Sequence, residues 1–123
     1  MADDSYFIRL ALEEAGLAFL EGEVPVGAVL VDKHGEILAK AHNRREALQD
    51  PTAHAELLAM QEGARKAGSW RLSGAILYVT KEPCVMCAGT MINARLDRLV
   101  YGCDDPKGGA LSLFGVLADE RLN

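Results

Sequence analysis

The segment "AILYVTKEPCVMCAGTMINARLDRLVYG", residues 75–102, contains the elements that decide the fold. It begins with a short apolar run, Ala75–Thr80, of the kind that forms a strand buried on both faces of a sheet. Pro83 suits the entry to a helix that we expect from about Cys84 to Arg95, and "DRLVYG" then predicts another strand. A strand, a helix and a strand in succession are typical of an α/β protein.

The residues upstream predict further strands of this sheet and helices to cover it. Apolar side chains recur at helical spacing over residues 3–21, which predicts an amphipathic helix. The segments "VPVGAVLVD" and "EILAKAHN", joined by the turn "DKHG", predict a hairpin, and residues 52–67 predict a helix that stops at Gly68. Helices and strands in this order predict a sheet with helices on its faces. The apolar positions of the first helix are Ile8, Ala11, Leu12, Ala15 and Phe19.

Size and charge limit the classes of function. The chain has 123 residues, the size of one compact domain, and we expect residues 1–123 to form a single domain. Half of the residues are hydrophobic and a quarter are charged, which is typical of a globular protein. The formal net charge of −5 excludes a general electrostatic attraction to nucleic acid, so any contact with RNA must be local.

The N-terminal residues and the cysteines indicate the compartment. "MADDSYFIRL" carries acids where a signal peptide carries a basic region, and no apolar run approaches the length that spans a membrane. We therefore expect a cytoplasmic protein with no membrane contact. In a reducing compartment, three cysteines favour metal binding or catalysis over disulfide bonds.

Two short motifs carry the chemistry. In "EPCVMCAG", Cys84 and Cys87 stand three positions apart at a predicted helix start, where two thiolates can converge on one tetrahedral ion. His54, in "DPTAHAE", stands 30 positions before Cys84 and can supply a third ligand if the two helices abut. Three protein ligands leave one position of a tetrahedral zinc ion open.

An open position is typical of a catalytic zinc site, because it holds a water molecule whose pKa the metal lowers to near neutrality. Glu56, two positions after His54, could reach that water and shuttle its proton. Each motif alone is unspecific, since Cys-x-x-Cys also occurs in thioredoxin-like redox sites and structural zinc knuckles. Together, H-x-E followed by P-C-x-x-C matches the signature of the zinc nucleobase deaminases.

The chain as a whole resembles the TadA-type tRNA-specific adenosine deaminases of the cytidine deaminase-like superfamily. The segments "VPVGAVLV", "AHNR", "DPTAHAE", "LYVTKEPCVMCAGTMINAR" and "VYGCDDPKGGA" occur in the family's order, and the resemblance extends to about Leu113. It implies a three-layer α/β/α fold with a mixed central sheet, one Zn²⁺ per chain, and a homodimer. It also implies hydrolytic conversion of the wobble adenosine to inosine, with a tRNA anticodon stem-loop as partner.

The same resemblance implies roles for individual residues. The zinc ligands would be His54, Cys84 and Cys87, and Glu56 would shuttle protons as zinc-activated water attacks C6 of the flipped adenine. Judged by its side-chain chemistry alone, the asparagine in "AHNR" could equally be a turn or capping amide. The substrate-binding residues that the resemblance implies are Val24, Val26, Asn43, Asp105 and Lys107.

A few positions depart from the family pattern or invite another interpretation. The chain ends at Asn123, where family members continue into a fifth strand and a C-terminal helix, so we expect a trimmed or incomplete, C-terminally short domain with four strands visible. Lys81 stands where relatives often have an apolar residue next to the pocket; its side chain could alter the pocket wall, but we expect it to snorkel outward. We interpret Cys103 as a buried or half-buried residue rather than a fourth ligand, and His34 and His42 as solvated or locally paired.

Two other functions compete with this prediction. The nearest is a zinc deaminase of a free base or nucleoside of the guanine or cytosine type, with a smaller pocket around the same metal. The segments "CVMCAGTMINAR" and "DDPKGGA" favour the tRNA enzyme, because they resemble the adenosine family more than its small-molecule relatives. The second is a structural zinc module without catalysis, which predicts a fourth protein ligand and a dispensable Glu56.

Overall fold

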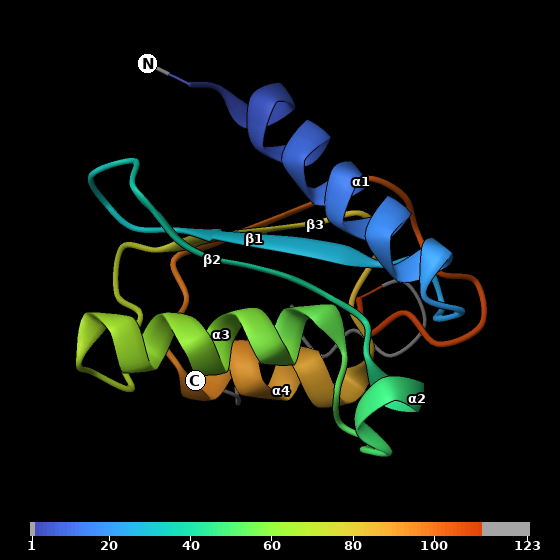
Figure 1. The fold of residues 1–123 in the computed structure, drawn as a ribbon. Coiled ribbons are helices and arrows are strands. Elements are labelled where there is room, and N and C mark those ends of the chain that lie inside the picture. The colour runs from blue at the N-terminus through green and yellow to red at the C-terminus, as the bar shows by residue number, and fades with distance from the viewer. Residues whose placement is uncertain (1, 112–123) are drawn as a thin grey trace.

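A sheet covered on both faces by helices forms the described part of the molecule. The computed structural model describes residues 2–111; residue 1 and residues 112–123, where the sequence predicts a short apolar segment, lie outside the described part. Helix α1 (Asp4–Leu20) covers one face of the sheet, and helices α3 (Ala55–Ala67) and α4 (Val85–Asn93) lie side by side on the other (Figure 1). The predicted three-layer α/β/α arrangement is confirmed.

The sheet is mixed, as predicted. Strand β1 runs antiparallel to both of its neighbours, β2 and β3, whereas β3 and β4 are parallel. A parallel pair needs a crossover connection, and α4 provides it between β3 and β4. The strands, in the spatial order β2-β1-β3-β4, are β2 (Ile37–His42), β1 (Gly27–Val31), β3 (Ile76–Val79) and β4 (Arg98–Tyr101).

The helix that was expected over residues 52–67 begins later, at Ala55. The carboxylate of Asp50 accepts hydrogen bonds from the backbone N–H and the hydroxyl of Thr52, at 2.8 and 2.7 Å, and this turn keeps the preceding residues out of the helix. A further four-residue helix, α2 (Arg45–Leu48), was not predicted.

The face that α1 buries differs from the predicted one. Leu12 is 55% exposed and Phe19 is 69% exposed, so those two positions were wrong. The reason is the close approach of α1 to the start of β1, where a Cβ atom on Gly27 would overlap the backbone oxygen of Ala11. Small side chains suit such a tight interface, and hydrophobicity alone does not reveal it. The buried residues of α1 are Phe7, Ala11, Ala15 and Ala18.

Two apolar layers meet at β1, whose five residues are all buried. Leu30 and Leu77 pack in the cluster beneath α3 and α4, while Val29 packs with Phe7 and Tyr78 beneath α1. Each fully buried side chain of this size contributes roughly 1.5–3 kcal/mol. The central strand therefore holds both helical layers in place.

Polar contacts connect α1 to the far edge of the sheet. The hydroxyl of Tyr78 donates to the carboxylate of Asp4 at 2.7 Å, and Arg98 on β4 donates to the same carboxylate at 2.7 and 3.2 Å. The Arg98 hydrogen bond and then the Tyr78 hydrogen bond lower the pKa of Asp4. The start of the first helix is thereby fixed to the last described strand.

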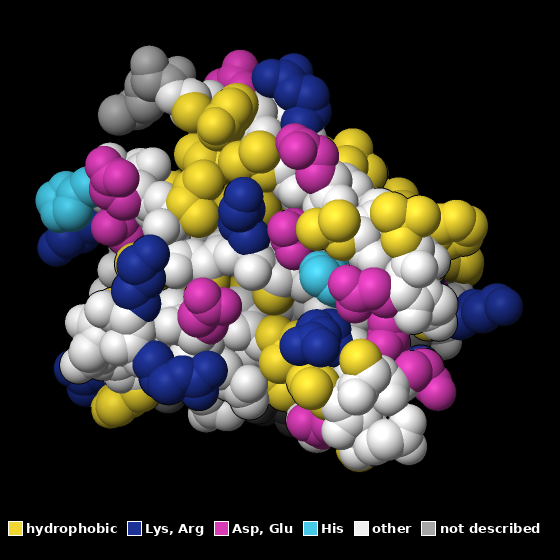
Figure 2. Space-filling model, in the orientation of Figure 1, with side chains coloured by type: hydrophobic (Ala, Val, Ile, Leu, Met, Phe, Trp, Pro, Cys, Tyr) yellow, Lys and Arg dark blue, Asp and Glu magenta, His cyan; other side chains and the backbone are white. Residues whose placement is uncertain are grey.

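The surface carries charges of both signs. In Figure 2, apolar side chains gather over α1, whereas basic and acidic side chains are interspersed over the rest of this face. Within residues 2–111, no helix is long and apolar enough to cross a membrane.

Candidate active site

The candidate site lies where two helices begin at one end of the sheet. His54 is the N-cap residue of α3 and Cys84 is the N-cap residue of α4, and both have extended backbone conformations. β3 ends at Val79, only a few residues before Cys84. The end of this strand therefore places Cys84, at the start of α4, next to the start of α3. The two helix starts thus bring residues 30 positions apart together.

The histidine and the two cysteines converge. The Nδ1 atom of His54 lies 3.6 Å from Sγ of Cys84 and 3.6 Å from Sγ of Cys87. Tetrahedral zinc with bonds of about 2.0–2.1 Å to nitrogen and about 2.3 Å to sulfur places such atoms about 3.6 Å apart, so the donor set fits zinc. In the part of the chain that the structure describes, this group has three members and no fourth ligand.

The electrostatics of the two thiols also favour a cation. A hydrogen bond from Cys87, aided by backbone N–H groups at the helix start, lowers the pKa of Cys84 to about 5. The same contact, together with burial, raises the pKa of Cys87. A divalent metal bound to both sulfurs would favour the thiolate form of each.

Glu56 lies beside this group in the first turn of α3. It is only 4% exposed, and burial raises the pKa of its carboxyl group, against a smaller lowering by its own backbone N–H and by His54. A carboxyl group held in this way can take up and release a proton nearer neutral pH than an exposed glutamate can.

A cavity of about 250 Å³ opens in front of these groups. His54, Glu56 and Cys84 form its floor, and Cys87 lies buried next to them. The structure thus brings together most of the residues that the sequence singled out. The other predicted residues in the cavity wall are Val24, Val26, Asn43 and Asp105.

Asn43 is suited to bind a ligand. It is 5% exposed and lines the cavity, and its backbone N–H donates to the carbonyl of Val26 at 3.1 Å. A buried amide that faces a cavity needs a partner, so a ligand with complementary donor and acceptor atoms is favoured there.

The loop after β4 forms the opposite wall and carries Asp105 and Lys107. The carboxylate of Asp105 accepts from the backbone N–H of Lys107 at 2.9 Å, which lowers the pKa of Asp105. The ammonium group of Lys81 lies 3.5 Å from that carboxylate. Lys107 itself is exposed and does not line the cavity, so it can meet only the part of a ligand that lies outside.

The cavity wall also contains three residues that were not among the predicted site residues: Arg45, Lys81 and Glu82. The side chain of Lys81 is 43% exposed yet lines the cavity, so it is not simply turned outward. In the sequence, Arg45 stands two positions after Asn43, and Lys81 and Glu82 stand just before the cysteine motif.

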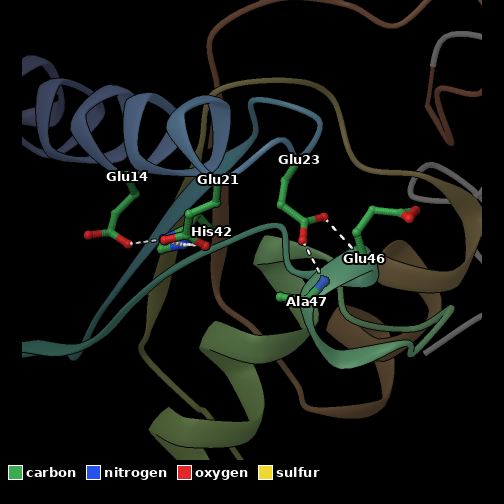
Figure 3. A network of polar contacts seen from close by, with 6 residues as sticks. All are labelled: Glu14, Glu21, Glu23, His42, Glu46 and Ala47. Atoms are coloured by element: carbon green, nitrogen blue, oxygen red, sulfur yellow. Dashed lines mark hydrogen bonds and ion pairs between the residues drawn. The ribbon is translucent and has the colours of Figure 1, made fainter.

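The structure also shows the surroundings of Cys103 and His42, which the sequence did not assign to the metal site. Cys103 is exposed rather than buried, and its thiol donates to the carbonyl of Thr80 at 3.7 Å. His42 is paired locally, as expected: its ring nitrogens lie 2.9 Å from Glu14 and 3.1 Å from Glu21 (Figure 3). Neither residue belongs to the metal group.

A buried carboxylate supports the wall that carries Arg45. Figure 3 shows Glu23 pointing at the first turn of α2, where it accepts from the backbone N–H groups of Glu46 and Ala47 at 3.1 and 2.8 Å. Burial raises the pKa of Glu23, but these two hydrogen bonds and nearby arginines outweigh that effect and lower it overall.

Comparison with known families gives a consistent result. Residues 1–103 match the family described as the cytidine and deoxycytidylate deaminase zinc-binding region. The tRNA-specific adenosine deaminase of Bacillus subtilis is 49% identical over all of this chain, which covers 76% of that protein. The tRNA-specific adenosine deaminase of Aquifex aeolicus is 49% identical over 96% of this chain and 78% of its own length.

Solved structures agree with these relatives. A structure from a study of A-to-I editing by tRNA:A34 deaminases at the wobble position of transfer RNA has a TM-score of 0.93 and 45% identity. That match covers 97% of this chain and 86% of the other. Guanine deaminase from Bacillus subtilis has a TM-score of 0.80 and 34% identity, and the match covers 84% of this chain and 66% of the other.

Proposed function

Because the chain belongs to the cytidine and deoxycytidylate deaminase family and, within it, to the tRNA-specific adenosine deaminases, we propose that it converts the wobble adenosine of a tRNA anticodon to inosine. The observation that carries this proposal is the position of Glu56, buried against a donor set that fits zinc and leaves one position of the metal for a small molecule. The reaction adds water at C6 of adenine and releases ammonia.

In this proposal, His54, Cys84 and Cys87 hold the metal, and the metal when bound supplies a Lewis acid that makes a water molecule acidic near neutral pH. Glu56 takes the proton at its carboxylate oxygen. It gives this proton to the adenine ring, then takes a second proton from the hydroxyl group added at C6 and passes it to the departing amino group, which leaves as ammonia. The burial of Glu56 in the cavity wall beside His54 and Cys84 supports this role, because the same group must stay next to the reacting atoms to accept a proton in one step and donate it in the next.

The cavity is proposed to take the flipped base. The amide of Asn43 hydrogen-bonds the edge of the purine, and Val24 and Val26 pack against the ring. A base inside a stacked strand cannot reach the floor of a cavity, so the target nucleotide must turn out of its strand. An unpaired anticodon loop makes that step easiest.

The rim of the cavity is proposed to bind the RNA around the base. Asp105 and Lys107 on one side can contact the neighbouring nucleotides, and Arg45 on the other can meet a phosphate group. These are local contacts, as a chain with a net charge of −5 requires.

The proposal also covers the domain organisation, the oligomeric state and the location of the protein. Residues 1–123 act as one zinc-dependent deaminase domain, with one zinc ion per chain. The family resemblance also implies a homodimer, which analytical ultracentrifugation checks by the mass of the particle. The cytoplasm is the proposed location, because that is where tRNA is available.

The test offers the purified zinc-loaded protein several substrates in parallel. An anticodon stem-loop with adenosine at position 34, free adenosine, cytidine and guanine are each incubated, and products are measured by mass spectrometry. We expect inosine from the stem-loop only. A stem-loop with guanosine at position 34 and adenosine elsewhere in the loop is the matched control and should stay unchanged. Activity on guanine or another free base alone would overturn the proposal in favour of the small-molecule deaminases.

A further inference from the structure

Glu82 is a buried carboxylate that the proposed reaction does not use. It is 3% exposed and stands two positions before Cys84. One of its oxygens accepts from the backbone N–H of Asp105 at 2.9 Å, and the other accepts from the backbone N–H of Leu111 at 2.9 Å. The side chain thus reaches across to both ends of the loop that carries Asp105 and Lys107.

Backbone hydrogen bonds join the same two segments. The N–H of Glu82 donates to the carbonyl of Cys103 at 2.8 Å, and the N–H of Ala110 donates to the carbonyl of Pro83 at 3.0 Å. The turn that leads to the cysteine motif and the loop over residues 103–111 are therefore attached at several points. Glu82 is the residue whose side chain completes this attachment.

At Gly109, the backbone of the loop passes very close to the carboxylate of Glu82. A Cβ atom at this position would overlap the carboxylate atoms of Glu82. A glycine here lets the backbone pass against the buried charge, which any larger residue would displace. A side chain at position 109 would therefore require the Glu82 carboxylate to shift away from its two backbone donors.

A carboxylate is required by the arrangement of donors. Two N–H groups point at two different oxygens, and an ionised glutamate offers acceptors at both. A glutamine would present an N–H to one of these donors, and a buried mismatch of that kind is costly. Because the loop has no helix or strand of its own, its shape depends on contacts of this type.

We propose that Glu82 is a positioning residue that holds the loop over residues 103–111 in the shape that presents Asp105 and Lys107 to the RNA beside the target adenosine. The inference rests on the proposed function, and it assigns Glu82 no part in the proton transfers. It predicts that weakening this attachment reduces the affinity for RNA and leaves the chemical step intact.

Two variants test the same contact from opposite sides. Glu82→Gln keeps the shape and removes one acceptor, while Gly109→Ala keeps the carboxylate and forces it away from the loop. For each variant we expect KM for the anticodon stem-loop to rise about tenfold, as for loss of a hydrogen bond to a charged group, with kcat within about twofold. Zinc content, measured by atomic absorption, should stay at one per chain.

Asp32→Asn is the matched control. The carboxylate of Asp32 also accepts from two backbone N–H groups, those of His34 and Glu36 at 2.8 and 2.9 Å, but in the hairpin after β1, away from the cavity. One oxygen accepts both bonds there, so an amide can replace it. Its KM and kcat should match those of the unchanged protein.

A variant cycle shows whether Glu82 acts through the loop. In a protein carrying both Asp105→Ala and Lys107→Ala, the effect of Glu82→Gln on KM should shrink to less than about twofold, because the groups it positions are gone. Independent, multiplying effects would overturn the proposal. So would an unchanged KM in Gly109→Ala, or a loss of zinc or kcat in Glu82→Gln with KM unchanged. If the unchanged protein makes no inosine from the stem-loop, the proposed function itself fails, which is a separate result.

Discussion

The floor and the rim of the cavity are built in different ways. The floor consists of His54, Glu56 and Cys84, with Cys87 buried next to them, all at the starts of two helices that are packed against the sheet. Of the rim residues, Lys81, Asp105 and Lys107 belong to loops and Arg45 begins the short helix α2, and side-chain contacts fix much of the geometry of the loops. A floor on helices gives the fixed distances that metal binding needs, while a loop rim can follow the shape of a larger ligand.

The first prediction tests the floor and has the largest expected effect. Glu56→Gln keeps the size of the side chain but cannot take up a proton, so we expect kcat to fall by roughly 10²–10⁴-fold. Zinc content should stay at one per chain, because Glu56 is not among the three donor residues. Single-turnover deamination of the stem-loop, with metal analysis of the same sample, checks both. A kcat within tenfold of the unchanged protein would mean that another group moves the proton.

The second prediction tests the rim. Arg45→Ala should raise KM for the stem-loop several-fold with kcat nearly unchanged, and it should make binding less dependent on salt. For one phosphate contact on single-stranded RNA, the slope of log affinity against log salt should fall by about 0.7. Fluorescence anisotropy at a series of salt concentrations measures the slope.

Arg71→Ala is the control for Arg45→Ala. Arg71 lies over the Trp70 ring, 5.0 Å from its centroid, and does not line the active-site cavity. Its removal should leave both KM and the salt slope unchanged. Equal effects of the two variants would mean that the rim acts only through the overall charge of the protein.

The third prediction, the smallest, concerns His42, which belongs to neither region. Burial lowers the pKa of His42, but hydrogen bonds and charges from Glu14 and Glu21 outweigh this and raise it overall. The charged histidine therefore stabilises the fold fully below its unfolded pKa of about 6.5, and this contribution is lost as the pH rises through the higher folded pKa. Other charged residues line the hollow beside it: Lys40, Arg44, Glu62 and Arg65.

Urea unfolding as a function of pH checks this third prediction. His42→Gln should lower the free energy of unfolding more at about pH 5.5 than at about pH 8.5, with little change in kcat. His34→Gln, in the exposed hairpin turn, is the control. A larger loss at high pH than at low pH would contradict the prediction.

The contrast between floor and rim also separates what the sequence could predict from what it could not. Glu56 and the three ligands occur in two short motifs at the starts of helices, so their chemistry is visible locally. Glu82 holds backbone groups that are 23 and 29 positions away. A side chain that binds a backbone N–H leaves no signature at the other end, because every residue except proline has that group.

The first helix shows a second limit of sequence patterns. The prediction followed large apolar residues, but the buried face of α1 is mostly alanine. Leu12 and Phe19 face outward instead. Which face is buried depends on how closely the helix approaches Gly27, and that distance is a property of the assembled fold.

The contact between Asp4 and Arg98 has a consequence for synthesis. These residues are 94 positions apart, so the first helix emerges from the ribosome long before the strand to which it is fixed. Until then, α1 can pack only on an incomplete sheet, because β3 lies between it and that edge. Contacts of such long sequence separation slow folding and couple the two ends of the chain. A tag or deletion at residue 4 would therefore remove a contact of β4, the edge strand that carries Arg98.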